Sequence, residues 1–333
     1  MRVIRLCLLL ATLPFCVRGA KTLDIYFIDV EGGQSTLVVS PSGQALLIDA
    51  GFAGNGGRDA DRIAAAASKA GVKQIDYLAI THYHGDHVGG VPEVAGKLPI
   101  KRFIDHGESV DKPSDLMAAY TRTRDKGEHI VAKPGLRIPL KGVDITVVAA
   151  AGAPLLKPLK GAGGANPLCA SAKQASTDRS ENSQSVGVVM EFGKFRFLDL
   201  GDLTADREIE LACPENRIGK IDLFLTSHHA THASPAPLVH ALAPRVAIMN
   251  NGARKGGSPA GWQVVRNSPG LEDFWQLHYS IAGGKENNSA EPLIANPEES
   301  CKGDWIKVSA QSNGEFTVTN GRTGFAKVYR PKK

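Results

Sequence analysis

Residues 81–90 read THYHGDHVGG, and this stretch decides how the rest of the chain is interpreted. Three of the 10 histidines in the 333-residue chain fall here, together with an aspartate, directly after the apolar run IDYLAI at 75–80. Neutral imidazole and carboxylate groups are the usual ligands of catalytic zinc and similar metals. The cluster therefore predicts a metal site at the end of a buried strand.

The spacing within the cluster favours two ions rather than one. Side chains two residues apart in an extended segment project to the same side, so His82 and His84 are suited to one ion. Asp86 and His87 are adjacent and point in different directions, which suits a second ion nearby. The glycines around them accept the backbone angles of a sharp turn.

Strands and helices are predicted on both sides of the cluster, in two similar halves. Each half runs from strands through a helix to a strand that ends in histidines, which favours two sheets between helical layers. The first half has strands at 22–30, 35–40, 44–51 and 75–80 and a helix at 59–70, capped by Asp59. The second has strands at 185–192, 193–202, 221–227 and 245–252 and helices at 204–212 and 235–241.

Two segments lie outside this scheme. Residues 152–182 are predicted to be a long surface excursion. Residues 256–333 are predicted to be a C-terminal loop and β-hairpin extension, with Asn313-Gly314 as its turn, packed on the domain formed by residues 20–255.

The N-terminus is predicted to be a secretory signal peptide, residues 1–19. Arg2 and Arg5 precede an apolar stretch that is too short to span a bilayer, and small residues follow it. The protein is therefore expected to be exported, to the periplasm or beyond, without a transmembrane segment after cleavage. Cleavage leaves 36 basic and 34 acidic residues, a net charge of +2. This near-neutral balance predicts no stable nucleic-acid complex.

Three cysteines remain after cleavage: Cys169, Cys213 and Cys301. Export allows one disulfide with one thiol left over, but the spacing does not decide the pairing.

HYHGDH at 82–87 resembles the H-x-H-x-D-H signature of the metallo-β-lactamase superfamily. By this resemblance, LLIDAG supplies Asp49, which supports the metal loop from behind, and FLDLGD supplies Asp202, which bridges two metals. LTSHHA supplies a terminal histidine, His228 or His229. The resemblance spans roughly residues 22–252. It implies an αβ/βα four-layer sandwich with a dinuclear centre at one edge, holding two zinc ions or, as the other candidate, manganese.

Within that superfamily the chain is most similar to the hydrolase domain of ComEC-type competence proteins. IDVEGGQSTLV at 28–38 and SHHATHAS at 227–234 carry this similarity. The region before Asp202 reads SENSQS, where most of the superfamily has a histidine. Asn182, Ser183 or water is expected to complete the first metal site instead, which counts against β-lactam hydrolysis and leaves the number of metals open.

The sequence thus predicts a metal-dependent hydrolase that uses a metal-activated hydroxide on phosphodiester bonds, in a small molecule or a nucleic acid. Asp86 would also orient the water, and His232 or a metal-bound water would protonate the leaving group. A lactone or β-lactam hydrolase of the same fold is the alternative, and a non-catalytic secreted binding module is the second. Arg254 and Lys255 are interpreted as part of a solvated loop and left outside the site.

Overall fold

The computed structural model describes residues 21–172, 176–232 and 234–331. The predicted signal peptide, residues 1–19, lies outside this described part.

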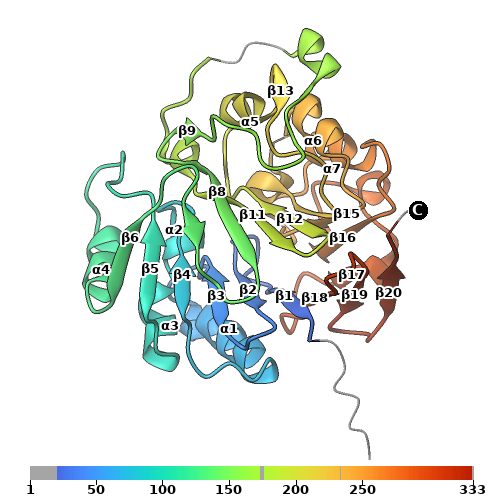
Figure 1. The fold of residues 1–333 in the computed structure, drawn as a ribbon. Helices are drawn as coiled ribbons and strands as arrows, with labels where there is room; N and C mark the ends of the chain where they lie inside the picture. The colour runs from blue at the N-terminus through green and yellow to red at the C-terminus, as the bar shows by residue number, and fades with distance from the viewer. Residues whose placement is uncertain (1–20, 173–175, 233, 332–333) are drawn as a thin grey trace, which may run out of the picture.

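Two large β-sheets pack face to face (Figure 1). The first has the order β20-β19-β18-β1-β2-β3-β4-β5-β6, and the second has β17-β16-β15-β14-β12-β11-β8-β7, with β9 paired to β8. The first sheet comprises β1 (Leu23–Phe27), β2 (Thr36–Val39), β3 (Ala45–Ile48), β4 (Tyr77–Ala79), β5 (Arg102–Asp105), β6 (Glu128–Val131), β18 (Ile306–Ala310), β19 (Phe316–Asn320) and β20 (Ala326–Tyr329). The second comprises β7 (Arg137–Ile138), β8 (Asp144–Ala150), β9 (Ala153–Pro154), β11 (Gly187–Phe192), β12 (Phe195–Asp199), β14 (Leu223–Leu225), β15 (Val246–Met249), β16 (Asp273–His278) and β17 (Ile294–Asn296). A separate two-stranded ribbon pairs β10 (Gly164–Ala165) with β13 (Glu215–Asn216).

Helices cover the outer face of each sheet. One side carries α1 (Arg58–Lys69), α3 (Val91–Lys97) and α4 (Asp115–Arg124), and the other carries α5 (Ala205–Ala212), α6 (Ala236–Leu242) and α7 (Pro259–Arg266). Strand β1 shows how its sequence serves both layers: Ile25 and Phe27 face the core between the sheets, while Tyr26 faces the helices. Strands buried on both faces read as continuous apolar runs, as ALLI of β3 does. The predicted αβ/βα four-layer sandwich is confirmed.

The strand directions bring distant polar residues to one edge. Strands β3 and β4 are parallel, and β12, β14 and β15 are parallel. The carboxyl ends of parallel strands lie at the same edge of a sheet, where α/β proteins place their ligands. Asp49 follows β3, His82 follows β4, Asp202 follows β12 and His229 follows β14.

The C-terminal segment contributes to both sheets. The predicted hairpin is present, with β18 and β19 joined around Asn313-Gly314, and β18 also pairs with β1. The sequence interpretation missed α7, β16 and β17, because the glycines and asparagines nearby suggested a loop. Ser258 caps α7 by accepting a hydrogen bond from the Gly261 amide, and β16 extends the parallel part of the second sheet.

The predicted cap of α1 was wrong. The residue before the helix is Gly57, in a left-handed conformation, and Asp59 lies within the first turn. The buried Asp59 carboxylate instead accepts a hydrogen bond from the Phe52 amide at 2.8 Å, which ties the loop after β3 to the helix.

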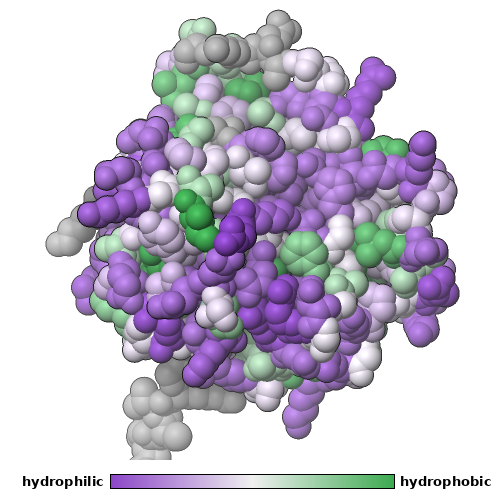
Figure 2. Space-filling model, turned by 180° about the vertical axis from the view of Figure 1, so that it is seen from behind, coloured by the Kyte–Doolittle hydropathy of each residue, from purple (hydrophilic) through white to green (hydrophobic). Residues whose placement is uncertain are grey.

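The surface excursion at 152–182 is anchored by a disulfide between Cys169 and Cys213, and Cys301 is a free thiol. Seen from behind, polar and charged residues cover most of the surface, and apolar residues form small separate groups (Figure 2). Within the described ranges, no helix is both long enough and apolar enough to cross a membrane.

Candidate metal centre

Four side chains from three separate segments meet at the common strand edge. One ligand atom each from Asp86, His87, Asp202 and His229 all lie within 4.8 Å of one another. His87 and His229 bring their Nε2 atoms to 3.3 Å. Asp86 Oδ2 lies 3.3 Å from the first of these nitrogens and 3.2 Å from the second, and Asp202 Oδ1 lies 3.4 Å from each.

The other two predicted ligands lie next to this group. His82 Nε2 and His84 Nδ1 are 3.0 Å apart, and the His82 and His87 rings have centroids 4.1 Å apart. His82 is fully buried, whereas His84 is partly exposed. Asp86 and His87 lie in a short helix, α2 (Gly85–Val88), which follows His84 in extended conformation.

Asp49 supports the cluster from behind. It is fully buried, and its carboxylate accepts hydrogen bonds from the Thr81 amide at 2.8 Å and the Thr81 hydroxyl at 2.7 Å. Its Oδ2 also lies 2.7 Å from His87 Nδ1. A carboxylate at this distance holds the proton on Nδ1 and leaves the lone pair of His87 on Nε2, the atom that faces the cluster.

The donor set fits a divalent cation. Asp202 Oδ1 is buried without a hydrogen-bond partner among the described residues, and two imidazole nitrogens face each other beside it. Such a group of buried acceptors is unfavourable unless a shared proton or cation satisfies it.

Charge interactions in the cluster are strong. Burial alone would raise the pKa of Asp202, but His229 and His87 hold it well below its usual value. Burial alone would lower the pKa of His87, but Asp202, Asp86 and Asp49 raise it well above its usual value. The carboxylates therefore draw protons onto these imidazoles, and a metal must compete with those protons.

Comparison with known proteins agrees with the family resemblance found in the sequence. Residues 28–154 match the sequence model of the Metallo-beta-lactamase superfamily. This part of the chain is therefore similar to the metallo-beta-lactamase superfamily.

Three individual relatives illustrate the match. The chain is 24% identical to ComE operon protein 3 of Bacillus subtilis over 255 residues, which is 71% of this chain and 29% of that protein. It is 32% identical to ribonuclease Z of Clostridium tetani over 77 residues, 21% of this chain and 22% of that protein. A solved metal-dependent hydrolase of the beta-lactamase superfamily aligns with a TM-score of 0.47 and 15% identity, covering 76% of this chain and 95% of that one.

The predicted resemblance to the superfamily and to ComEC-type proteins is thereby confirmed. The chain spans less than a third of the length of the two curated relatives.

The structure distinguishes the two adjacent histidines, His228 and His229. His229 is fully buried and turned into the cluster, whereas His228 places Nε2 3.6 Å from Asp202 Oδ2 and faces outward. His228, His229 and Ala230 all have positive φ, between 51° and 54°. The loop after β15 holds this unusual segment in place, because the Gly257 amide donates to His229 O at 2.9 Å and the Ser258 amide donates to Ala230 O at 2.9 Å.

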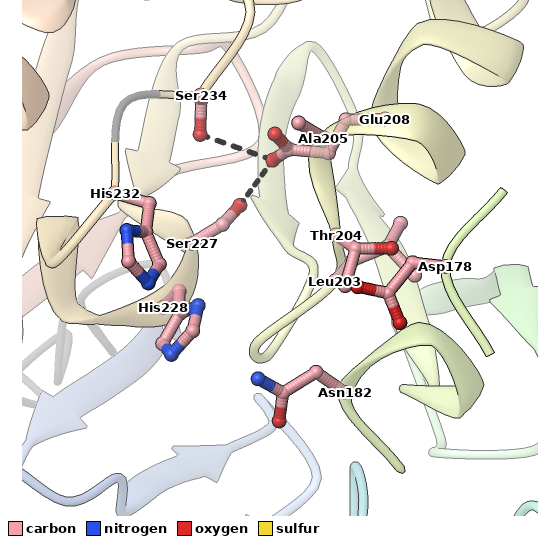
Figure 3. A pocket seen from close by; sticks show the side chains of 10 residues that line it. All are labelled: Asp178, Asn182, Leu203, Thr204, Ala205, Glu208, Ser227, His228, His232 and Ser234. Carbon is pink, nitrogen blue, oxygen red and sulfur yellow. Dashed lines mark hydrogen bonds between the residues drawn. The ribbon is translucent and has the colours of Figure 1, made fainter. Parts of the chain in front are cut away.

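A pocket of about 240 Å³ is lined in part by His228, whose Nε2 lies 3.6 Å from Asp202 Oδ2 (Figure 3). His228 and His232 lie together on one wall, with ring centroids 4.9 Å apart, and Asn182 lies on another. Asn182 Oδ1 is buried and unpartnered among the described residues, so it is available to a ligand. The Ser183 hydroxyl instead donates to Ser180 O at 2.7 Å.

Glu208 lies in the wall of the same pocket. It accepts hydrogen bonds from the Ser227 hydroxyl at 2.6 Å and the Ser234 hydroxyl at 3.1 Å (Figure 3). Burial raises the pKa of Glu208 to about 7. No sequence pattern singled out this residue, because an ordinary amphipathic helix also contains glutamates.

Another buried acid, Asp199, connects the two halves behind the site. Its oxygens accept hydrogen bonds from Gln34 Nε2 at 3.2 and 3.1 Å, and Gln34 Oε1 accepts one from Asn250 at 3.1 Å. Burial raises the pKa of Asp199 to about 7. None of these hydrogen bonds joins Asp199 to a residue of the four-residue cluster.

Lys255 is the site residue that the sequence interpretation excluded. Its Nζ contacts Asp86 Oδ2, whereas the neighbouring Arg254 pairs with Glu299. Both lie in one polar loop, so the spacing of residues could not tell which side chain reaches the centre.

Proposed function

We propose that this protein is an exported metal-dependent hydrolase that cleaves phosphodiester bonds. The observation that carries the proposal is the convergence of Asp86, His87, Asp202 and His229 within 4.8 Å, beside the His82–His84 pair. Zinc is the cation that suits this nitrogen and oxygen set, with manganese as the other candidate.

Asp86, His87 and His229 would hold one cation and His82 and His84 a second. Asp202 would serve both. When bound, such cations lower the pKa of water and withdraw charge from the attacked group. Asp49 keeps the lone pair of His87 on Nε2. Asp86 orients the attacking water.

The pocket beside the centre would receive the leaving group. His228 and His232 stand at its wall, and His232 lies near enough to donate a proton to a leaving oxygen there. Asn182 presents its free oxygen where many superfamily members have a histidine, and it would complete the surroundings of the His82–His84 ion.

The choice of a phosphodiester rests on the relatives. One is named as a ribonuclease, and a match over 255 residues is to a ComE operon protein. The proposal of export rests on the signal-like residues 1–19 and on the Cys169–Cys213 disulfide, since disulfides persist in oxidising compartments. Cell fractionation and N-terminal sequencing should find the mature protein outside the cytoplasm, beginning at Ala20.

Parallel turnover assays test the reaction. The metal-loaded protein should hydrolyse bis(p-nitrophenyl) phosphate and single-stranded DNA faster than a lactone or nitrocefin. The double variant His82→Ala, Asp202→Ala should lose turnover and keep its circular dichroism spectrum. Turnover of the lactone or nitrocefin alone would replace the phosphodiester with a carbonyl substrate. If the wild type and the double variant both hydrolyse every substrate at the same negligible rate, a binding module would be favoured.

A further inference from the structure

We propose that Lys255 binds the anionic group of the substrate at the metal centre and thereby favours phosphodiesters over neutral esters. This inference rests on the proposed function, because it names how that site selects its substrate.

The backbone holds Lys255 in a fixed place. The Gly252 amide donates to Lys255 O at 2.8 Å, which closes a turn after β15. On one side of the turn, a side chain built on Gly32 would lie 2.9 Å from the Lys255 Cβ. On the other side, a side chain built on Gly256 would lie 2.4 Å from His229 O. The turn is therefore packed between the loop after β1 and the strained histidine segment.

The side chain leads from this turn to the open side of the cluster. Nζ contacts Asp86 Oδ2, the oxygen that lies 3.2 Å from His229 Nε2. It also lies 5.4 Å from the centroid of the Phe52 ring, which favours a cation at that position. The Lys255 side chain is 40% exposed, so solvent and substrate reach it.

The charges explain what this ammonium does once metal is bound. A bound metal would offset the negative charge of Asp86, and the Lys255 ammonium would then lie beside a second positive charge. An anion placed between them is attracted by both, whereas an uncharged ester gains nothing from the ammonium before charge develops on it. A phosphodiester carries that negative charge from the start. Lys255 should therefore contribute to phosphodiester binding in the ground state.

Arg254 provides a matched control on the same loop. Its guanidinium pairs with Glu299, and its side chain is 73% exposed. Removing its charge changes the net charge of the protein as much as removing that of Lys255, without removing the contact at Asp86.

The test compares Lys255→Met, Lys255→Arg and Arg254→Met in the full metal-loaded protein. Methionine keeps an unbranched stem beside Phe52 and removes the ammonium group, with its charge and its hydrogen-bond donors. We measure KM and kcat on bis(p-nitrophenyl) phosphate and on p-nitrophenyl acetate, a neutral ester with the same leaving group. Binding of inorganic phosphate is measured by calorimetry, and metal content by elemental analysis.

Lys255→Met should raise KM for the diester and the dissociation constant for phosphate by about tenfold, the loss of one charged hydrogen bond. KM for the acetate and the metal content should stay unchanged. Lys255→Arg should restore phosphate binding, and Arg254→Met should behave as wild type.

Three results would overturn the inference. Phosphate affinity in Lys255→Met could equal that of wild type, or both substrates could lose activity equally. The variant could also bind one more metal equivalent than wild type, which would show that the ammonium stands in for a cation. If wild type fails to cleave the diester while Lys255→Met still weakens phosphate binding, Lys255 is confirmed as an anion-binding residue and the proposed phosphodiester hydrolysis is wrong.

Discussion

Replacing Asp49 by asparagine tests how the centre controls the proton on His87. Asparagine keeps the size of the side chain and tolerates the left-handed backbone of Asp49, whose φ is 59°. One oxygen can still accept from the Thr81 amide. The other oxygen, which lies 2.7 Å from both the Thr81 hydroxyl and His87 Nδ1, becomes an amide donor.

A donor at that position favours the opposite tautomer of His87. The lone pair then moves to Nδ1 and the proton to Nε2, where it faces His229 Nε2 and blocks the metal ligand. Loss of a supporting residue behind a metal ligand costs about 10–100-fold in affinity, or about 1.4–2.7 kcal/mol.

The assay is a zinc titration of the metal-free protein against a competing chelator at neutral pH. Asp199→Asn is the control, because Asp199 is equally buried but bonds Gln34 rather than a histidine. It should leave zinc affinity unchanged. Zinc affinity in Asp49→Asn equal to that of wild type would refute the tautomer argument.

Three further variants probe other parts of the structure. His229→Ala should lose more metal affinity than the ~10–100-fold that loss of a supporting residue costs. His228→Ala should keep its metal and lose only kcat/KM. Loss of metal in His228→Ala but not in His229→Ala would exchange the roles of the two histidines. Because burial raises the pKa of Glu208 from 4.5 to about 7, its contribution to stability is present below about pH 4.5 and is lost as pH rises through about 7. The free energy of unfolding in urea of Glu208→Gln, relative to that of wild type, should therefore rise by about 3 kcal/mol between about pH 5 and about pH 8. A difference in unfolding free energy that does not change with pH would contradict this. Opening the Cys169–Cys213 disulfide, which spans 44 residues, with Cys213→Ser should cost about 4 kcal/mol of unfolding free energy in the chain-entropy model; an unchanged melting curve would be inconsistent with that bond.

The layered fold and half of the centre could be predicted because their signals are local. Alternating and continuous apolar runs fixed the strands near the site, and His82, His84, Asp86 and His87 lie within one short stretch. The glycines were expected to permit a sharp turn, and α2 begins at Gly85. The expectation that Asp86 and His87 point in different directions was wrong, because Asp86 Oδ2 and His87 Nε2 lie 3.3 Å apart in one cluster.

The remaining features depend on contacts between distant segments. The choice of His229 over His228 follows from positive φ angles that hydrogen bonds from Gly257 and Ser258 stabilise. Lys255 reaches Asp86 across a sequence separation of 169 residues. Strand β16 forms because β15 offers it an unpaired edge, which a sequence rich in turn residues does not reveal.

An anomalous difference map at the zinc absorption edge, from crystals grown with excess zinc, tests the metal centre most directly. A peak within about 2.0–2.2 Å of His87 Nε2, His229 Nε2 and Asp86 Oδ2 is expected. Density at a saturating zinc concentration that leaves this position empty, or that places the ion away from these three side chains, would contradict the account.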